Sequence, residues 1–244
     1  LLYGSMFILM IYNIFLYVAT KDVSYFYYVN YLLSVSVFMF LELGHGLIHF
    51  EEYFGKVHRE SIIYFIWFSV ISGSLFTRSF LNTRIEFPKI DAVLVGFIAV
   101  AIVSIVIDEL HIYHVSVAWT SMFNSILMPT FLSMVFYTYI QGNKSAKFFF
   151  MAWIFNVVGF FVLAVATSEF ISMTPFVIAA TPIGILMESL LFSFALAHRI
   201  KNEQSEMVKA DDEAVRYLKQ YQLAFDNSRS GMYEMTLDGR VSNV

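Results

Sequence analysis

The sequence predicts an all-α integral membrane protein: a bundle of seven transmembrane helices, then a cytoplasmic helix and the truncated start of an α/β domain. Three observations support this prediction. Of the 244 residues, 59% are hydrophobic and only 14% are charged, whereas soluble domains average about 45–50% apolar and about 25% charged residues. Seven stretches are long and apolar enough to cross a hydrocarbon core of about 30 Å. After residue 200 the composition becomes abruptly polar.

The predicted spans follow one another at short intervals and leave little chain outside the membrane. They cover Leu1–Ala19, Tyr25–Leu43, Ile62–Phe80, Ala92–Ile107, Val117–Ile140, Phe148–Thr167 and Phe176–Ala197, and the fourth is the shortest. The chain begins in apolar sequence without an initiator methionine or a basic leader, and it stops within a strand-like run. We therefore expect both ends to be cut from a longer protein.

The Lys and Arg residues between the spans predict the orientation, because cytoplasmic loops are enriched in both. With a cytoplasmic C-terminus, only Lys56 and Arg59 lie outside. The inside loops then hold Lys21, Arg78, Arg84, Lys89, Lys144 and Lys147. An odd number of spans places the N-terminus outside. The sequence thus predicts a multi-pass protein of a cytoplasmic membrane, with bilayer lipid as a partner. No basic stripe indicates a nucleic-acid partner, and the absence of cysteine excludes disulfides and thiolate metal sites.

The polar segment 201–222 contains no Gly or Pro and is predicted to be helical. Its core-like positions lie seven residues apart, at Ile200, Met207, Ala214 and Tyr221, with Ala210, Tyr217 and Ala224 three residues after the last three. This heptad spacing fits a solvated helix that continues from the last span, or a parallel pair formed with a second copy. Residues 233–237 and 240–244 flank Asp238-Gly239 as a hairpin would. We therefore divide the chain into 1–200, 201–222 and 223–244.

Polar residues inside the predicted spans are candidates for a site, because a carboxylate at membrane depth costs about 2.5–3.5 kcal/mol and must find a partner. Glu188 is the first of them. It either locks the last span to its neighbours as a neutral, hydrogen-bonded group, or forms a contact that changes with the state of the protein, or transfers protons. Arg78 and Asn124 are conceivable partners. Asn13, Asn124 and Asn156 are expected to join helices, with a ligand pocket as the alternative.

Two other kinds of site would fit a seven-helix membrane chain: a metal site and a retinal site. Glu42, His45, His49 and Glu52 are spaced so that they share one face of a helix. Gly44 and Gly46 interrupt that stretch, and His111 and His114 form only a similar lone pair near Asp108 and Glu109. We therefore expect no metal and no cofactor. A retinal Schiff base needs a lysine in the last span, where Phe176–Ala197 has none.

Four motifs carry a family resemblance. They are Tyr3-Gly4 with Ile11-Tyr12-Asn13; Ser24-Tyr25-Phe26-Tyr27-Tyr28; Arg78-Ser79-Phe80-Leu81-Asn82-Thr83-Arg84 with Pro88 and Asp91; and Glu188 with Ala195-Leu196-Ala197-His198-Arg199-Ile200. In this order they resemble the bacterial seven-transmembrane receptors with diverse intracellular signalling modules. Asn82 and His198 stand where that pattern usually has Asp. The residues from Gln222 onward, including Phe225-Asp226-Asn227-Ser228 and Leu237-Asp238-Gly239-Arg240, resemble the opening of a PAS domain.

The resemblance implies a signal-transduction receptor of the bacterial inner membrane. An unknown extracytoplasmic ligand would change the last span, and Glu188, His198 and Arg199 would relay the change to the cytoplasmic helix of a homodimer. A PAS domain and an output domain, commonly a diguanylate cyclase or a histidine kinase, would follow in the longer protein. No catalytic residue is assigned between Leu1 and Val244. A transporter or channel, or a membrane metal-binding protein, stays open as the alternative.

Overall fold

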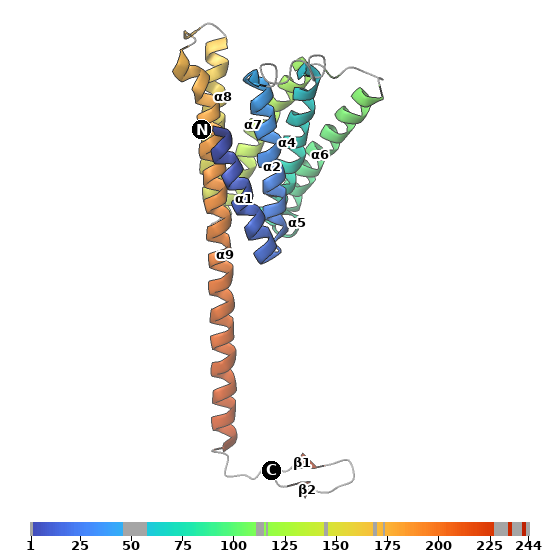
Figure 1. Cartoon of the computed structure of the whole chain (residues 1–244). Coiled ribbons are helices and arrows are strands. Elements are labelled where there is room, and N and C mark those ends of the chain that lie inside the picture. The colour runs from blue at the N-terminus through green and yellow to red at the C-terminus, as the bar shows by residue number, and fades with distance from the viewer. Residues whose placement is uncertain are drawn as a thin grey trace. The chain divides into compact units, whose positions relative to one another are not determined.

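The computed structural model describes residues 2–45, 58–110, 115, 117–143, 146–167, 170–172, 174–226, 234–235 and 241–242. It divides into two units, Leu1–His198 and Arg199–Val244. The first unit is a bundle of helices, and the second contains the last part of helix α9 and two short strands (Figure 1).

The first two helices form an antiparallel hairpin whose turn is built from polar residues. Helix α1 (Leu2–Thr20) is followed by Lys21, which adopts a left-handed backbone conformation with φ 59°. Helix α2 (Val23–Glu42) begins after Asp22, whose carboxylate accepts a hydrogen bond from the Ser24 backbone N–H. This N-cap satisfies one of the donors that a helix start leaves without a partner.

The next elements are α4 (His58–Phe80), the one-turn helix α5 (Thr83–Glu86) and α6 (Pro88–Glu109). Pro88 is the first residue of α6, a position where its missing N–H costs nothing. The expectation that the fourth span is the shortest was wrong. Helix α6 has 22 residues, because Lys89 and Asp91 lie inside its first turn, where an apolar window ends but a helix does not.

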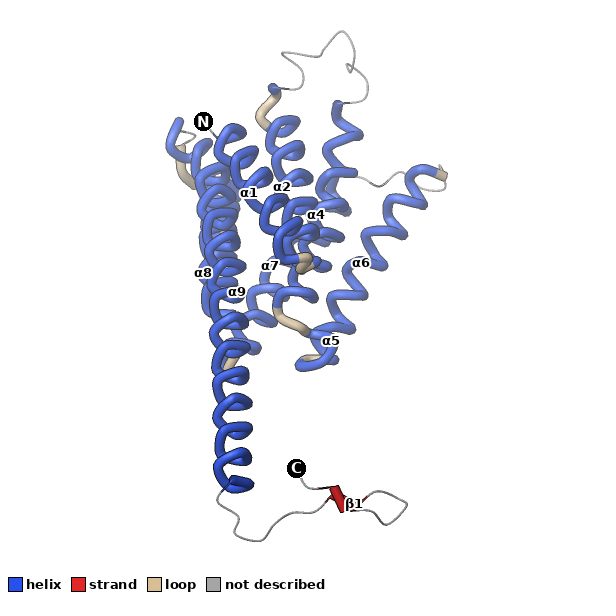
Figure 2. The backbone as a smooth tube through the Cα atoms, turned by 60° about the horizontal axis from the view of Figure 1, so that its bottom comes forward, coloured by secondary structure: helices blue, strands red, loops and turns tan. Residues whose placement is uncertain are grey.

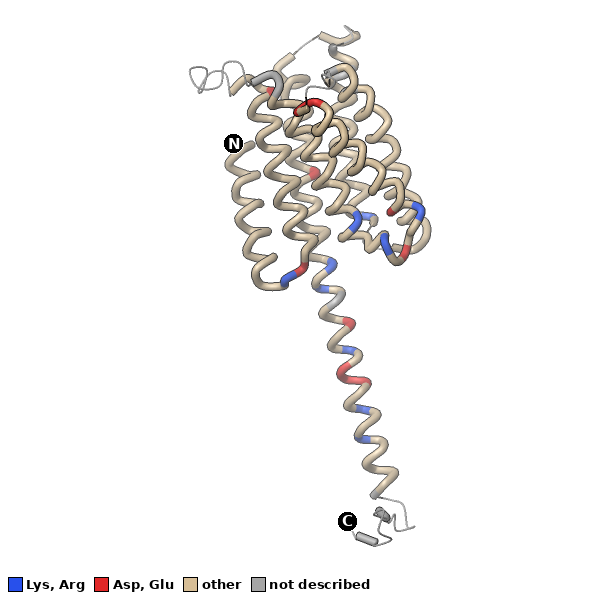
Figure 3. The backbone as a smooth tube through the Cα atoms, turned by 90° about the vertical axis from the view of Figure 1, so that its right-hand side faces the viewer, with Lys and Arg blue, Asp and Glu red and all other residues tan. Residues whose placement is uncertain are grey.

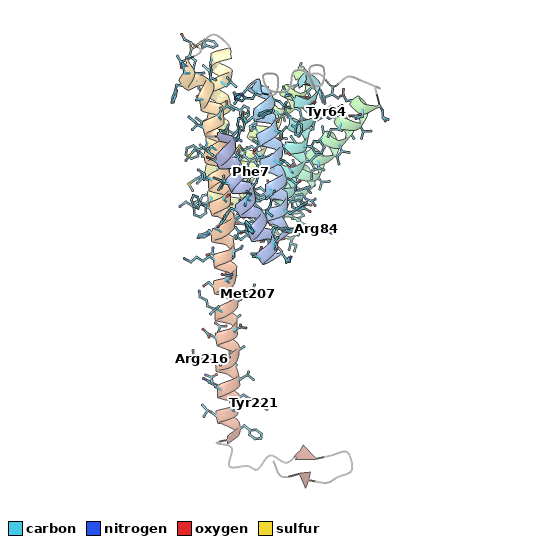
Figure 4. The ribbon with its side chains drawn as sticks, viewed as in Figure 1. Phe7, Tyr64, Arg84, Met207, Arg216 and Tyr221 are labelled. Carbon is cyan, nitrogen blue, oxygen red and sulfur yellow. The ribbon has the colours of Figure 1, made fainter. Side chains whose placement is uncertain are left out.

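Three further helices complete the bundle: α7 (Val117–Ile140), α8 (Ala146–Thr167) and α9 (Pro175–Asp226). Among the described residues, seven helices are long and apolar enough to cross a membrane. Side chains on their outer faces are large and apolar, and Phe7 is 60% exposed (Figure 4). In a bilayer such faces meet lipid, while the backbone groups are satisfied within each helix. The predicted seven-helix membrane bundle is confirmed.

Helices α1, α2, α4 and α6 pack in that order, and α7 packs against α4 and α8 (Figure 2). Aromatic rings from several helices pack against one another in the core. Phe192 of α9 lies with its ring centroid 4.6 Å from that of Phe149 in α8 and 5.2 Å from that of Phe76 in α4. A second stack joins Phe97, Phe131 and Trp153, from α6, α7 and α8. Ring contacts of this kind fill the interior where helices cross.

Apart from the buried Glu188, the charged side chains in the described part of the bundle lie near its ends. In Figure 3 the blue Lys and Arg segments drawn for the first unit lie toward the end where α1 meets α2 and α4 meets α5. The opposite end carries acidic residues, and the Tyr64 hydroxyl donates a hydrogen bond to Asp108 there, at 2.8 Å. The bundle therefore has one basic and one acidic end.

The second unit consists of the polar part of α9 and the strands β1 (Glu234–Met235) and β2 (Val241–Ser242). The strands pair antiparallel, with Met235 opposite Val241. The residues between them, including Asp238-Gly239, lie outside the described residues, so the predicted hairpin turn stays a prediction. The helix continues to Asp226, beyond the predicted linker end at Gln222. The PAS-like start and the three-part division stay predictions.

Candidate functional site

Glu188 lies in the middle of a buried polar cluster formed by three helices. Its side chain is fully buried in α9. The Tyr31 hydroxyl, from α2, donates to both carboxylate oxygens at 3.0 Å, and the Asn156 amide nitrogen, from α8, donates to Oε2 at 2.5 Å. The carboxylate therefore joins α9 to two neighbouring helices at once.

A second set of hydrogen bonds joins α9 to α1 and α2 one turn further along. The Tyr28 hydroxyl donates to the backbone carbonyl oxygen of Ser189, and the Ser193 hydroxyl donates to Tyr28 at 3.3 Å. The Asn13 amide nitrogen of α1 donates to the Ser193 hydroxyl oxygen at 3.2 Å. We call Asn13, Tyr28, Tyr31, Asn156, Glu188, Ser189 and Ser193 the α9 network. Its side chains are all nine-tenths or more buried.

Helical spacing brings these side chains together. Tyr28 and Tyr31 lie three residues apart on one face of α2, and Ser193 lies four residues, about one turn, after Ser189, which adjoins Glu188 in α9. Gly73 of α4 makes room for the Tyr31 ring, because a Cβ added there would lie 3.3 Å from Tyr31 Cδ2. The network thus depends on a small residue in a fifth helix, α4.

Helices α8 and α9 approach each other closely beside the network. A Cβ added at Gly184 would lie 2.6 Å from the backbone oxygen of Phe155, and one added at Gly159 would lie 2.9 Å from that of Ala180. The Thr181 hydroxyl donates to the Gly159 carbonyl oxygen at 3.1 Å. Small residues at such crossings let backbones pack without an intervening side chain.

The motif at the basic end forms a tight corner between α4 and α6. The Arg78 guanidinium donates to both oxygens of Asp91, at 2.7 and 2.9 Å, and the Thr83 hydroxyl donates to the same carboxylate at 2.9 Å. Asn82 is left-handed, with φ 50°, a conformation that Asn and Asp tolerate better than other side chains. This explains why Asn can stand at a position where the resembling receptors usually have Asp.

The other residues of the predicted motif from Arg78 to Arg84 take no part in this ion pair. Phe80 and Leu81 are buried, whereas Arg84 is exposed on α5. His198 is exposed, and its ring centroid lies 5.1 Å from that of Phe148 at the start of α8. Arg199 begins the second unit. The relay role predicted for His198 and Arg199 stays a prediction.

The conceivable partners of Glu188 turn out differently from the sequence-based expectation. Arg78 pairs with Asp91 instead, and the amide nitrogen of Asn124 donates to the Thr120 carbonyl oxygen of its own helix. Sequence reasoning did not assign Tyr28 or Tyr31 to the site, although Tyr28 belongs to one of the family motifs. Tyrosine is an ordinary aromatic residue in membrane spans, so only the recurrence of Tyr at 28 and 31 on one helix face could have pointed to them.

The predicted group of Glu42, His45, His49 and Glu52 is only partly described. His45 packs its ring against Tyr3 and Phe40, while His49, Glu52, His111 and His114 lie outside the described residues. Within the described part of the chain, no three His, Asp or Glu side chains are grouped as a metal site would require. Its role stays undecided, and the expectation of no metal stays a prediction.

The comparisons with known proteins agree with the seven-helix arrangement. The model of one family, described as 7TM diverse intracellular signalling, matches residues 1–199. No curated protein and no solved structure matches the chain. The match covers the whole bundle, including the α9 network and the Arg78–Asp91 corner. The chain therefore belongs to the seven-transmembrane family of diverse intracellular signalling.

Proposed function

We propose that this chain is a transmembrane receptor module in which α9 relays a change in the bundle to the segment after His198. The observation that carries the proposal is the position of α9. Groups of α9 accept hydrogen bonds from α1, α2 and α8 in the α9 network. The same helix continues for 52 residues in all, to Asp226.

The network has the properties of a contact that can rearrange. The side-chain oxygens of Asn13 and Asn156 are buried and, within the described residues, accept no hydrogen bond. Buried polar groups normally have partners, so these two oxygens make the present arrangement less than fully satisfied. A ligand that binds a second arrangement more tightly shifts the population toward it, by as much as the two affinities differ.

The family supports the remaining parts of the proposal. The ligand is extracytoplasmic, the membrane is a bacterial inner membrane, the N-terminus lies outside, and the C-terminus is cytoplasmic. The basic end of the bundle, where Lys21 follows α1 and where Arg84 and Lys89 lie in α5 and α6, then faces the cytoplasm as expected. The receiving part of the longer protein is a PAS domain followed by a diguanylate cyclase or a histidine kinase. This chain itself performs no catalysis.

A spin label after the last span tests the relay. The chain has no cysteine, so Lys201→Cys provides one labelled site, about 20 Å along the helix from Glu188 at 1.5 Å per residue. We expect Asn156→Ala and Tyr31→Phe, each in the Lys201→Cys protein in lipid nanodiscs, to change the electron paramagnetic resonance line shape. Tyr31→Phe is the sharper variant because it removes only a hydroxyl.

The matched control is Asn124→Ala. It removes the same amide group from another span, where the hydrogen bond stays within one helix. We expect the label spectrum to stay unchanged in this control. An unchanged spectrum in both Asn156→Ala and Tyr31→Phe would show that the network does not communicate with the helix beyond His198, and the relay would have to be abandoned.

A further inference from the structure

The segment of α9 after Arg199 presents an apolar surface that nothing in the described part of the chain covers. Met207 is 65% exposed, Leu218 63% and Tyr221 70%. We call the following residues the apolar stripe: Met207, Val208, Ala214, Val215, Leu218, Tyr221 and Phe225. The three labelled side chains of this segment, Met207, Arg216 and Tyr221, project from the helix in Figure 4.

Apart from Asp211, the charged residues between Met207 and Phe225 lie away from the apolar stripe. The opposite face carries Lys209, Asp212, Glu213, Arg216 and Lys219. Helices that lie on a membrane surface carry mostly Lys and Arg on the polar face, whereas this face holds both signs. A face with charges of both signs is suited to solvent and not to an anionic membrane surface. We therefore expect the apolar stripe to bind a protein surface.

A second copy of the chain fits the stripe, given the receptor orientation of the proposed function, on which this inference rests. Two copies in one membrane project α9 in the same direction and at the same height. Their stripes can then meet only as a parallel, in-register and self-complementary pair. Heptad spacing is the pattern that such pairs use.

Two seams are possible, and they share Met207, Ala214 and Tyr221. The first adds Ala210, Tyr217 and Ala224, as the heptad pattern in the sequence predicts. In a parallel pair this seam places Glu206 beside Asp211 of the partner copy, because flanking residues five apart meet across the interface. It also leaves Leu218 and Phe225 at flanking positions, on the edge of the contact. Repulsion and poor burial both count against it.

The second seam adds Asp211, Leu218 and Phe225 to the shared residues. Its flanking positions between Met207 and Phe225 carry no charge: they are Val208, Val215 and Gln222 on one side and Ala210, Tyr217 and Ala224 on the other. Its one unfavourable feature is Asp211, which faces its own copy. A polar residue at a core position weakens a helix pair while fixing its register.

We propose that a second copy of this chain docks on the apolar stripe through this second seam, with Leu218, Phe225 and Asp211 of the two copies opposed. The two seams differ by a rotation of each helix of about 51°, one seventh of a turn. Asp211 therefore keeps the pair weak and close in stability to the alternative seam. This is the kind of balance that a small change in the bundle can tip.

Cysteine cross-linking in native membranes tests the seam directly. Since the chain has no cysteine, each single variant reports one position, and a disulfide needs Cα atoms about 4.4–6.8 Å apart. We expect Leu218→Cys and Asp211→Cys to cross-link at least threefold more than Tyr217→Cys and Ala210→Cys. Tyr221→Cys, shared by both seams, is the positive control, and Lys219→Cys on the charged face is the background control.

A second measurement uses Asp211→Leu in the Leu218→Cys protein. Removing the opposed carboxylates should raise cross-linking of Leu218→Cys at least twofold. Preferential cross-linking at Tyr217→Cys and Ala210→Cys overturns the proposed seam, and background levels at Tyr221→Cys and Leu218→Cys overturn pairing altogether. Neither result affects the relay, which the label at position 201 tests separately.

Discussion

A single carboxylate, that of Asp91, fixes the corner between α4 and α6. It accepts two hydrogen bonds from Arg78 and one from Thr83, and the Arg78 and Asp91 side chains are only 27% and 15% exposed. Most surface ion pairs contribute little, because solvent screens them and side chains must be ordered. The fork geometry and partial burial distinguish this pair.

Arg78→Ala should therefore lower the free energy of unfolding by about 1–3 kcal/mol, since two charge-assisted hydrogen bonds are lost. Arg78→Lys should recover only part of this loss, because an ammonium group cannot donate as a planar fork. Denaturation of the purified protein in mixed micelles measures both. Arg84→Ala, which removes an exposed arginine of the same corner, should change stability by less than about 0.5 kcal/mol. Equal losses in Arg78→Ala and Arg84→Ala would contradict the role of the pair.

The sequence identifies residues of the site better than it identifies their contacts. Hydropathy singled out Glu188, Asn13 and Asn156 because polar groups are costly inside a membrane. The rotation of each helix, which decides that Tyr31 and not Arg78 reaches Glu188, is set by packing of the whole bundle. Asn82 shows the same limit, because its left-handed backbone, with φ 50°, becomes visible only in the structure.

Among the elements, α9 and α8 form the contact most sensitive to side-chain size. Gly184 faces the backbone oxygen of Phe155, and backbone atoms cannot move aside as a flexible side chain can. Thr181 adds a hydrogen bond across the same crossing. The spans themselves were predictable from length and hydropathy, but this crossing was not, because glycine leaves no signal of which helix it faces.

Gly184→Ala should force α8 and α9 apart and lower stability by about 1–3 kcal/mol, the usual cost of overpacking. Gly96→Ala in α6 is the matched control, because a Cβ added there would have no neighbouring atom within 4 Å. It should be neutral or stabilise by up to about 1 kcal/mol through higher helix propensity. Denaturation in mixed micelles again gives the comparison. A Gly184→Ala protein as stable as the Gly96→Ala protein would show that the crossing is looser than the structure indicates.

On the scale of the whole molecule, the bundle has a polarity that its single helices lack. Lys21 follows α1, and Arg84 and Lys89 lie in α5 and in the first turn of α6, whereas Asp108 and Glu109 end α6. Loops rich in Lys and Arg stay in the cytoplasm during insertion. The asymmetry therefore predicts the orientation of every helix, and with it a cytoplasmic position for the segment of α9 after His198.

Helix α6 offers the most direct test of this orientation. Its 22 residues span about 33 Å at 1.5 Å per residue, so Lys89 and Leu110 lie near opposite faces of the membrane, and both are exposed. In intact cells with the outer membrane made permeable, a membrane-impermeant maleimide should label Leu110→Cys and leave Lys89→Cys unmodified until the inner membrane is opened. The absence of native cysteine removes background labelling.

Met207→Cys should behave like Lys89→Cys, because α9 leaves the bundle at the basic end. Labelling of Lys89→Cys and Met207→Cys in intact cells would reverse the orientation, and the apolar stripe would then lie outside, beyond reach of any cytoplasmic output domain.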